Sequence, residues 1–354
     1  AGWLHPLVNA AHAGDAYANL RQPNQFATLC SIGIAMAVWG FPRIPRLAAL
    51  ALIALFAVAS AASVSRTGVV EGVLLLGLAA VWKDEGRRDR ILLCLGGGVF
   101  YLLAAWTLPH VLEAMGEVPT RTLWGRIGGG ESCSSRIVLW SNVLTLIAAK
   151  PLVGWGWGEL DFAHFINLYP GARFCEILDN AHNLPLHLAV ELGLPAAIVV
   201  CAATLAWVWR RRPLLEQDPA RRVAWAVLGL LLLHSLLEYP LWYGPFQIAL
   251  GTCIGWLLVR TEAPAARDGA WVGRIAGAVL AICVPLIAWD YWRVGQVYLP
   301  AEQRRPAWAR DPLAEARRSW FFSSQAKFAE LTLANLSRDN AQWMYDLSKE
   351  MLHH

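Results

Sequence analysis

The sequence predicts an all-α polytopic membrane protein. Of its 354 residues, 56% are hydrophobic and only 16% are charged, and 19 are Trp. The mean hydropathy is +0.41, whereas a soluble globular domain has about 25% charged residues. The formal net charge of +4 is accounted for by basic residues in short loops, which argues against a nucleic-acid partner.

Apolar runs indicate about eight transmembrane helices. A helix needs roughly 20 apolar residues to cross about 30 Å of hydrocarbon, and shorter runs leave the helix ends open. The chain starts without Met in a polar stretch, so we expect further spans upstream in the intact protein. The eight runs are residues 26–39, 47–63, 67–82, 91–108, 184–209, 223–237, 244–259 and 271–289.

Basic residues in alternate loops predict the orientation, because Lys and Arg are retained on the cytoplasmic side. Four connections are basic: 43–46, 83–90, 210–222 and 260–274. The other connections then face outward, which means the periplasm for a chain of bacterial composition. We expect a bacterial inner-membrane protein whose functional face is periplasmic.

Two domains follow from this topology. Residues 1–291 form the transmembrane domain, and within it residues 109–181 form a long periplasmic loop. Apolar residues at helical spacing predict an interfacial helix over 136–149, which Pro151 ends. Residues 292–354 form a helical periplasmic tail that we expect to continue in the intact protein. This tail either binds a partner or covers the functional face, or it packs as helices without a direct role.

Two cysteines of the periplasmic loop, Cys133 and Cys175, are predicted to form a disulfide. The other five of the seven cysteines lie within apolar runs, where Cys acts as a small apolar residue. An oxidising compartment allows the loop pair to bond. The alternative is two unpaired buried thiols.

The loop also contains alternating Gly and Trp at residues 153–158. Such a segment lets the backbone approach a surface that the indoles face. It suits a sugar-binding platform or an interfacial anchor, and we favour the anchor because aromatic belts mark membrane interfaces.

Polar residues collect at the predicted outer ends of the spans. Arg66 and Arg136 each follow a Ser, His182 precedes a long apolar run, and Glu238-Tyr239 precede a Pro. Taken singly, each residue also has a structural explanation: an Arg in contact with solvent, a His at a helix N-terminus, or a Tyr in the aromatic belt at the membrane interface. Together, two Arg and a titratable His suit a lipid diphosphate substrate. Guanidinium groups bind phosphate oxygens with paired donors, and His can accept a proton from a hydroxyl.

Metal and nucleotide motifs are missing from the sequence. His182 and His187 fall on separate helical faces, and neither HExxH nor a Cys/His zinc pattern is present. We therefore expect neither a metal nor another cofactor.

The His182-Asn183 pair, followed after nine residues by Gly193, resembles the signature of the bacterial O-antigen ligase and polymerase superfamily. That signature continues with Gly, Thr or Tyr three residues later, where this chain has Ala196. Other stretches resemble its O-linked protein oligosaccharyltransferase branch, the pilin glycosylation ligases: residues 24–27, 65–68, 135–140, 154–158, 234–242, and the tail from 290 to 329.

This resemblance implies transfer of an oligosaccharide from undecaprenyl diphosphate to Ser or Thr hydroxyls of a periplasmic, pilin-like protein, without metal and with inversion. Arg66 and Arg136 would hold the diphosphate, and His182 would activate or orient the hydroxyl. Gln25, Asn183, Glu238 and Tyr239 are further site candidates.

Other functions remain open at this point. The same chemistry serves O-antigen ligation to lipid A-core and glycan polymerisation. A transporter is the rival from another class, but it would carry ionisable residues deep within its spans. Here only Glu71, Glu191 and His234 do so.

Overall fold

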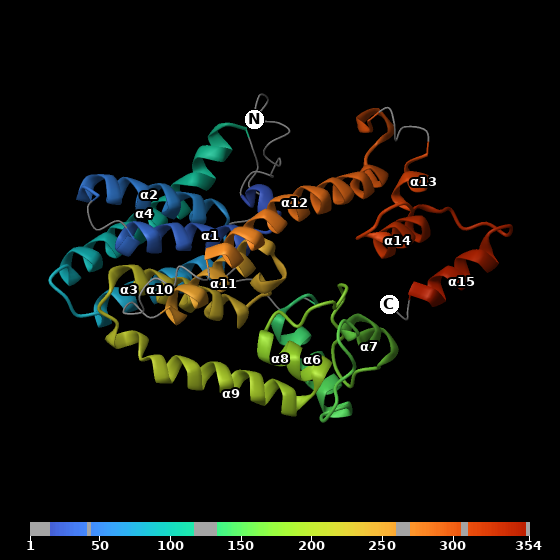
Figure 1. Cartoon of the computed structure of the whole chain (residues 1–354), viewed down its shortest axis with the longest axis horizontal. Helices are drawn as coiled ribbons and strands as arrows, with labels where there is room; N and C mark the ends of the chain where they lie inside the picture. Colours follow the sequence, from blue (N-terminus) through green and yellow to red (C-terminus); the bar gives the residue numbers. More distant parts are fainter. Residues whose placement is uncertain (1–14, 41–43, 117–132, 260–269, 306–310, 352–354) are drawn as a thin grey trace. The chain divides into compact units, whose positions relative to one another are not determined.

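The structure is a computed structural model that describes residues 15–40, 44–116, 133–259, 270–305 and 311–351. The regular secondary structure of this described part is all helical, with 14 α-helices, short 3-10 helices and a π-helix over Met36–Gly40. The chain falls into two compact units, residues 1–260 and 261–354 (Figure 1). Residues 117–132 of the predicted loop, and Arg43, Arg260 and Arg267 of the basic connections, lie outside the described residues.

Six helices of unit 1 form a bundle in which α1 packs against α2, α3 and α10, α2 against α4, and α10 against α11. Fully buried Ala35, Ile53, Leu75 and Leu230 occupy its core. Small residues such as Ala allow the helices to approach closely, which favours association in a bilayer. The six helices are α1 (Pro23–Ala35), α2 (Arg46–Ala62), α3 (Arg66–Val81), α4 (Arg87–Ala114), α10 (Pro219–Ser235) and α11 (Gly244–Leu258).

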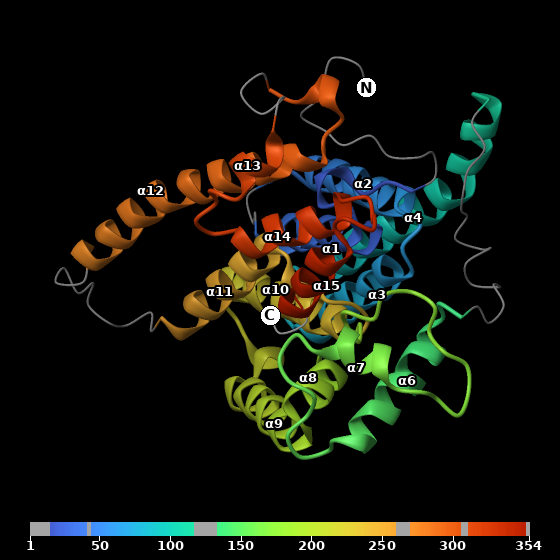
Figure 2. The same cartoon turned by 90° about the vertical axis from the view of Figure 1, so that its right-hand side faces the viewer.

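A second group of helices in unit 1 has its own core. It consists of α6 (Arg136–Ala149), α7 (Leu160–Ile166) and α8 (Leu184–Leu192). Helix α6 packs against both others, and the three lie together in both views (Figures 1 and 2). Leu139, Val143, Leu160 and Val190 are fully buried among them. The bounds of α6 agree with the predicted helix over 136–149.

Three helical segments are long and apolar enough to cross a membrane: Arg87–Ala114, Leu194–Leu215 and Gly277–Tyr298. The helices at the other predicted spans have 17 residues or fewer, so the count of eight spans stays a prediction. The chain is a membrane protein with several further apolar helices.

The predicted span over 184–209 is wrong in one respect, because the structure breaks it at Gly193. Helix α8 ends there and α9 (Leu194–Arg211) begins. Gly193 has φ 88° and ψ 161°, a conformation that essentially only glycine adopts. Pro195 in the first turn of α9 has no N–H to continue the helical pattern from α8.

Unit 2 consists of α12 (Ala270–Gly295) and the short helices α13 (Pro312–Ala316), α14 (Ser323–Leu333) and α15 (Ala341–Met351). The predicted domain boundary at residues 291 and 292 falls inside α12, because the helix continues to Gly295. Asp290 connects α12 to the tail: its Oδ2 accepts the Ser319 hydroxyl at 2.7 Å and the Phe321 N–H at 2.9 Å.

Candidate functional site

A buried carboxylate, Glu238, lies at the centre of the candidate site. Its Oε1 accepts a hydrogen bond from Asn24 Nδ2 at 2.8 Å and a second from Arg136 Nη2. Its Oε2 lies 2.6 Å from His182 Nδ1. The Glu238 side chain is 3% exposed, whereas those of His182 and Arg136 are 20% and 33% exposed. The site therefore has a buried anion beneath a cation and an imidazole that both reach solvent.

The local backbone fixes the position of His182. This residue has φ 49°, and its N–H donates to Asn180 Oδ1 at 2.8 Å. The next residue, Asn183, caps α8, since its Oδ1 accepts the Leu186 N–H at 3.1 Å. The Asn183 Nδ2 donates to the carbonyl of Leu236 at 2.9 Å. Asn183 thus joins the start of α8 to the end of α10, which places His182 next to Glu238.

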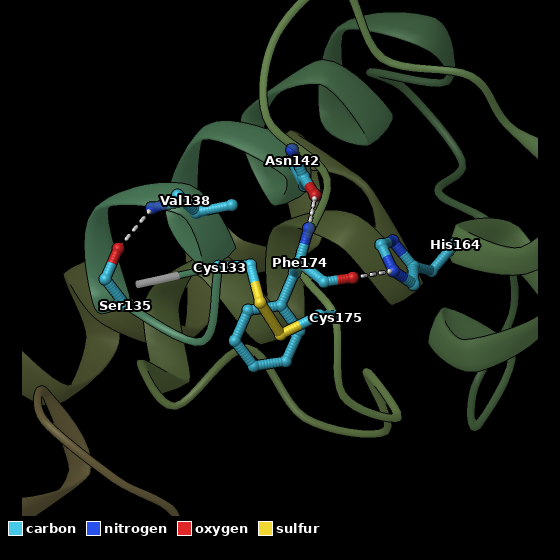
Figure 3. Close-up of a disulfide and its surroundings, with 7 residues drawn as sticks. All are labelled: Cys133, Ser135, Val138, Asn142, His164, Phe174 and Cys175. Carbon is cyan, nitrogen blue, oxygen red and sulfur yellow. Dashed lines mark hydrogen bonds between the residues drawn. A yellow bond between two sulfur atoms is a disulfide. The ribbon is translucent and has the colours of Figure 1, made fainter. Parts of the chain in front are cut away.

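Arg136 is held by the start of α6. It is the first residue of that helix, and Ser135 caps the helix by accepting the Val138 N–H at 3.3 Å. Cys133 and Cys175, the pair predicted to bond, form a disulfide with a Cα–Cα distance of 5.5 Å (Figure 3). The bond lies three residues before Arg136, so it restrains the segment that leads into this side chain.

Neighbouring contacts hold the other end of the disulfide. The Phe174 N–H donates to Asn142 Oδ1 on α6 at 2.8 Å, and the Phe174 carbonyl lies 3.2 Å from His164 Nε2 on α7 (Figure 3). Cys175 is the next residue. The loop that carries it is therefore bonded to both α6 and α7.

Electrostatics favour an ionised Glu238. Burial alone would raise the pKa of this carboxyl, but the hydrogen bond from His182 and the charge of Arg136 outweigh burial and hold the pKa below its ordinary value. An ionised Glu238 can only accept hydrogen bonds. His182 therefore donates through Nδ1, and Nε2 is the acceptor nitrogen of the neutral ring.

Tyr239 packs against the imidazole. Its ring lies edge-on to His182, with 4.8 Å between the ring centroids. Burial, together with the negative charges of Glu238 and Asp179, raises the pKa of the Tyr239 phenol. The phenol is therefore neutral and remains a hydrogen-bond donor at physiological pH.

Arg66 and Gln25 each adjoin a residue of the hydrogen-bond chain that runs from Ser65 through Asn24 to Glu238. Arg66 is exposed and opens α3, and the preceding Ser65 donates to Asn24 Oδ1 at 2.6 Å. Gln25 is fully buried, and its amide atoms have no hydrogen-bond partner among the described residues. Asn24, which connects Ser65 to Glu238, was not among the predicted site residues.

A second polar cluster, also not predicted, is buried within the bundle. Thr28 Oγ1 lies 2.6 Å from Glu71 Oε1 and 2.5 Å from His234 Nδ1. All three side chains are fully buried. The Thr28 hydroxyl also lies 3.1 Å from the Asn24 carbonyl, which connects the cluster to the site along one turn of α1. Its sequence signal was the presence of ionisable residues inside apolar runs.

The Gly-Trp segment packs against the junction between α8 and α9. The Trp155 N–H donates to Val190 O and the Gly156 N–H to Glu191 O, both at 2.9 Å. A Cβ on Gly154 would lie 2.3 Å from the carbonyl oxygen of Glu191. A Cβ on Gly193 would lie 2.2 Å from the carbonyl oxygen of Leu152. These glycines therefore allow a backbone-to-backbone contact within the protein.

The two tryptophans of this segment differ. Trp155 is half-buried and donates through Nε1 to the carbonyl of Leu146 at 2.9 Å, whereas Trp157 is 64% exposed. The described residues contain no group of three or more His, Cys, Asp and Glu side chains that could hold a metal ion.

Comparisons with known proteins agree with the resemblance. Residues 25–201 match the O-antigen ligase family, and residues 222–354 match the family described as virulence factor membrane-bound polymerase, C-terminal. No solved structure matches the chain significantly.

Two curated relatives come from Acinetobacter baylyi. The ComP-specific O-oligosaccharyltransferase is 23% identical over 258 residues, which cover 71% of this chain and 45% of the relative. The general O-oligosaccharyltransferase is 24% identical over 281 residues, which cover 75% of this chain and 48% of the relative. The chain thus spans about half the length of these relatives. The first family match covers half of the chain and includes Arg66, Arg136 and His182. The chain therefore belongs to the O-antigen ligase family.

Proposed function

We propose that this protein transfers an oligosaccharide from undecaprenyl diphosphate to Ser or Thr hydroxyls of periplasmic proteins such as pilin. The observation that carries the proposal is the 2.6 Å contact between His182 Nδ1 and Glu238 Oε2. It orients a partly exposed imidazole with Nε2 available to accept a proton. The proposal also draws on the names of the two relatives.

In the proposed reaction, Nε2 of His182 takes the proton of the acceptor hydroxyl while its oxygen attacks the anomeric carbon of the first sugar. The bond from that carbon to the diphosphate oxygen breaks, and undecaprenyl diphosphate leaves with the bonding electrons. Glu238 stabilises the imidazolium that forms. A single displacement inverts the anomeric centre.

Arginines supply the charge stabilisation in this proposal. Arg136 is already oriented by Glu238, and Arg66 opens α3 one residue after Ser65, which bonds to Asn24. Guanidinium groups in these places would bind the diphosphate and stabilise the charge that develops on it as it leaves. Metal-free catalysis of this kind depends on positioning, charge stabilisation and deprotonation.

Two alternative acceptors have support from the family matches. The O-antigen ligase match favours transfer to lipid A-core, and the polymerase match in the C-terminal part favours extension of the glycan itself. Both reactions share the donor and the proposed role of His182. In each case we propose an inner-membrane protein with its site at the periplasmic face.

A reconstituted assay separates these acceptors. Purified protein in liposomes receives undecaprenyl diphosphate oligosaccharide, and a pilin-like protein and lipid A-core are offered side by side with products read by mass. We expect glycan on the pilin. Glycan on lipid A-core alone would show a ligase, longer lipid-linked glycan would show a polymerase, and no product with any acceptor would contradict a transferase.

A further inference from the structure

Two exposed tryptophans stack beside the candidate site. Trp157 and Trp242 are 64% and 44% exposed. Their rings are nearly parallel, with an interplanar angle of 14° and 6.4 Å between centroids. Trp242 closes the short turn that begins after Tyr239, the residue that packs on His182. One short turn therefore joins the indole pair to the Tyr239 ring, which contacts the proposed base.

A buried His and a buried Glu pack against this pair of indoles. The His187 ring meets the Trp242 ring edge-on at 4.9 Å and the Trp157 ring at 6.3 Å. His187 Nε2 lies 3.4 Å from Glu191 Oε2, and both side chains are almost fully buried. Glu191 also accepts a hydrogen bond from the backbone of Gly158, the residue after Trp157. The Trp157 loop and the Trp242 turn therefore both contact this buried His–Glu pair.

These contacts distinguish the pair from a membrane-anchoring tryptophan. An interfacial anchor needs only an amphipathic ring near the headgroups. Trp106 on α4 fits that description, since it is 63% exposed and its ring contacts His110 on its own helix. Trp157 is 64% exposed, but its ring contacts the rings of Trp242 and His187, and the next residue, Gly158, donates a hydrogen bond to Glu191. Such preorganisation reduces the ordering cost of binding a ligand.

We propose that Trp157 and Trp242 form a stacking surface for a sugar ring of the lipid-linked glycan, beside His182. This proposal rests on the proposed function for the identity of the donor. The apolar face of a pyranose ring packs on an indole, while its hydroxyls stay in water. The sequence alone favoured an anchor for the Gly-Trp segment, and the structure separates half-buried Trp155 from exposed Trp157.

Binding measurements with two lipids test this surface without requiring transfer. One probe is undecaprenyl diphosphate carrying a single N-acetylglucosamine, and the other is undecaprenyl diphosphate alone. Both are titrated into the full chain in nanodiscs, for the wild type and for the Trp157→Ala and Trp242→Ala variants. Trp106→Ala is the matched control, because it removes an indole of similar exposure whose ring contact is with His110 on its own helix.

We expect the wild type to bind the glycosylated lipid more tightly, with each of the two variants weakening that Kd by about tenfold. The Kd for undecaprenyl diphosphate should stay within about twofold in all proteins, and Trp106→Ala should change neither value. Equal weakening for both lipids would indicate an anchor and overturn the proposal, as would an unchanged preference in both variants or no preference in the wild type. A sugar preference that depends on the two Trp, in a protein that transfers no glycan, would keep this inference and reject the transfer reaction.

Discussion

Two of the His–Glu pairs in unit 1 have histidines only five residues apart, and these two pairs differ in exposure and in charged neighbours. His182 is partly exposed, lies 2.6 Å from Glu238, and shares that carboxylate with Arg136. His187 is buried, lies 3.4 Å from Glu191, and contacts indole rings. The same residue types therefore serve two purposes. Solvent access and a nearby cation suit the first pair to proton transfer, and burial suits the second to support.

Removing each imidazole is the most direct way to break this comparison. We expect His182→Ala to lower kcat by about 10²–10⁴-fold, since that range is typical of a general base. His187→Ala should leave kcat within about tenfold of the wild-type value and mainly raise the KM for the donor. It removes only the ring that packs against Trp157 and Trp242. Steady-state kinetics of glycan transfer at varied donor concentration would separate the two effects.

Thermal unfolding and donor binding of both variants serve as controls. His182→Ala should bind donor normally, which distinguishes lost chemistry from lost structure. Near-normal transfer by His182→Ala would reject the assignment of the base. A loss of kcat in His187→Ala as large as that in His182→Ala would mean that the two pairs act as one unit.

The first pair could be anticipated only in part from the sequence. His182 stood out at the start of an apolar run, and Glu238 before a Pro, since both are ionisable residues at predicted span ends. The contact between them joins residues 56 apart, and that between Asn24 and Glu238 joins residues 214 apart. Such pairings depend on how helices pack, which hydrophobic periodicity does not determine. Asn24 was therefore missed as a site residue.

The surroundings of the second pair were harder to predict. The run over 184–209 is apolar on average, and Gly193 and Pro195 do not change this average enough to divide it. The break at Gly193 depends on a backbone conformation that only glycine readily adopts, on Pro195, and on a backbone-to-backbone contact with the Gly-Trp segment. Helix α6 was placed correctly because its apolar spacing and the Pro151 that follows it are local signals.

Gly193→Ala tests whether this backbone contact supports the second pair. The new Cβ would lie 2.2 Å from the Leu152 carbonyl oxygen, at a φ of 88°. Strain of this kind costs about 1–3 kcal/mol before the steric clash is counted. We expect a clear drop in the thermal unfolding midpoint and a weaker donor affinity.

Gly251→Ala on α11, where a Cβ meets no atom within 4 Å, is the control and should stabilise the helix by about 0.5–1 kcal/mol. Equal unfolding midpoints for the two variants would show that the contact at Gly193 is not needed.

The acid sensitivity of the first pair is expected to have the smallest effect. Glu238 has a pKa below its ordinary value in the folded protein, whereas an unfolded Glu has a pKa of about 4.3. As the pH falls, the unfolded state binds this proton first. The stability that Glu238 contributes is therefore fully present above about pH 4.3 and is lost as the pH falls through the folded pKa.

Thermal unfolding between pH 7 and pH 3 should show a smaller acid-induced drop for Glu238→Gln than for the wild type, with each unit of pKa difference worth about 1.4 kcal/mol. Parallel curves for the two proteins would mean that neither the His182 hydrogen bond nor the Arg136 charge stabilises the ionised carboxylate.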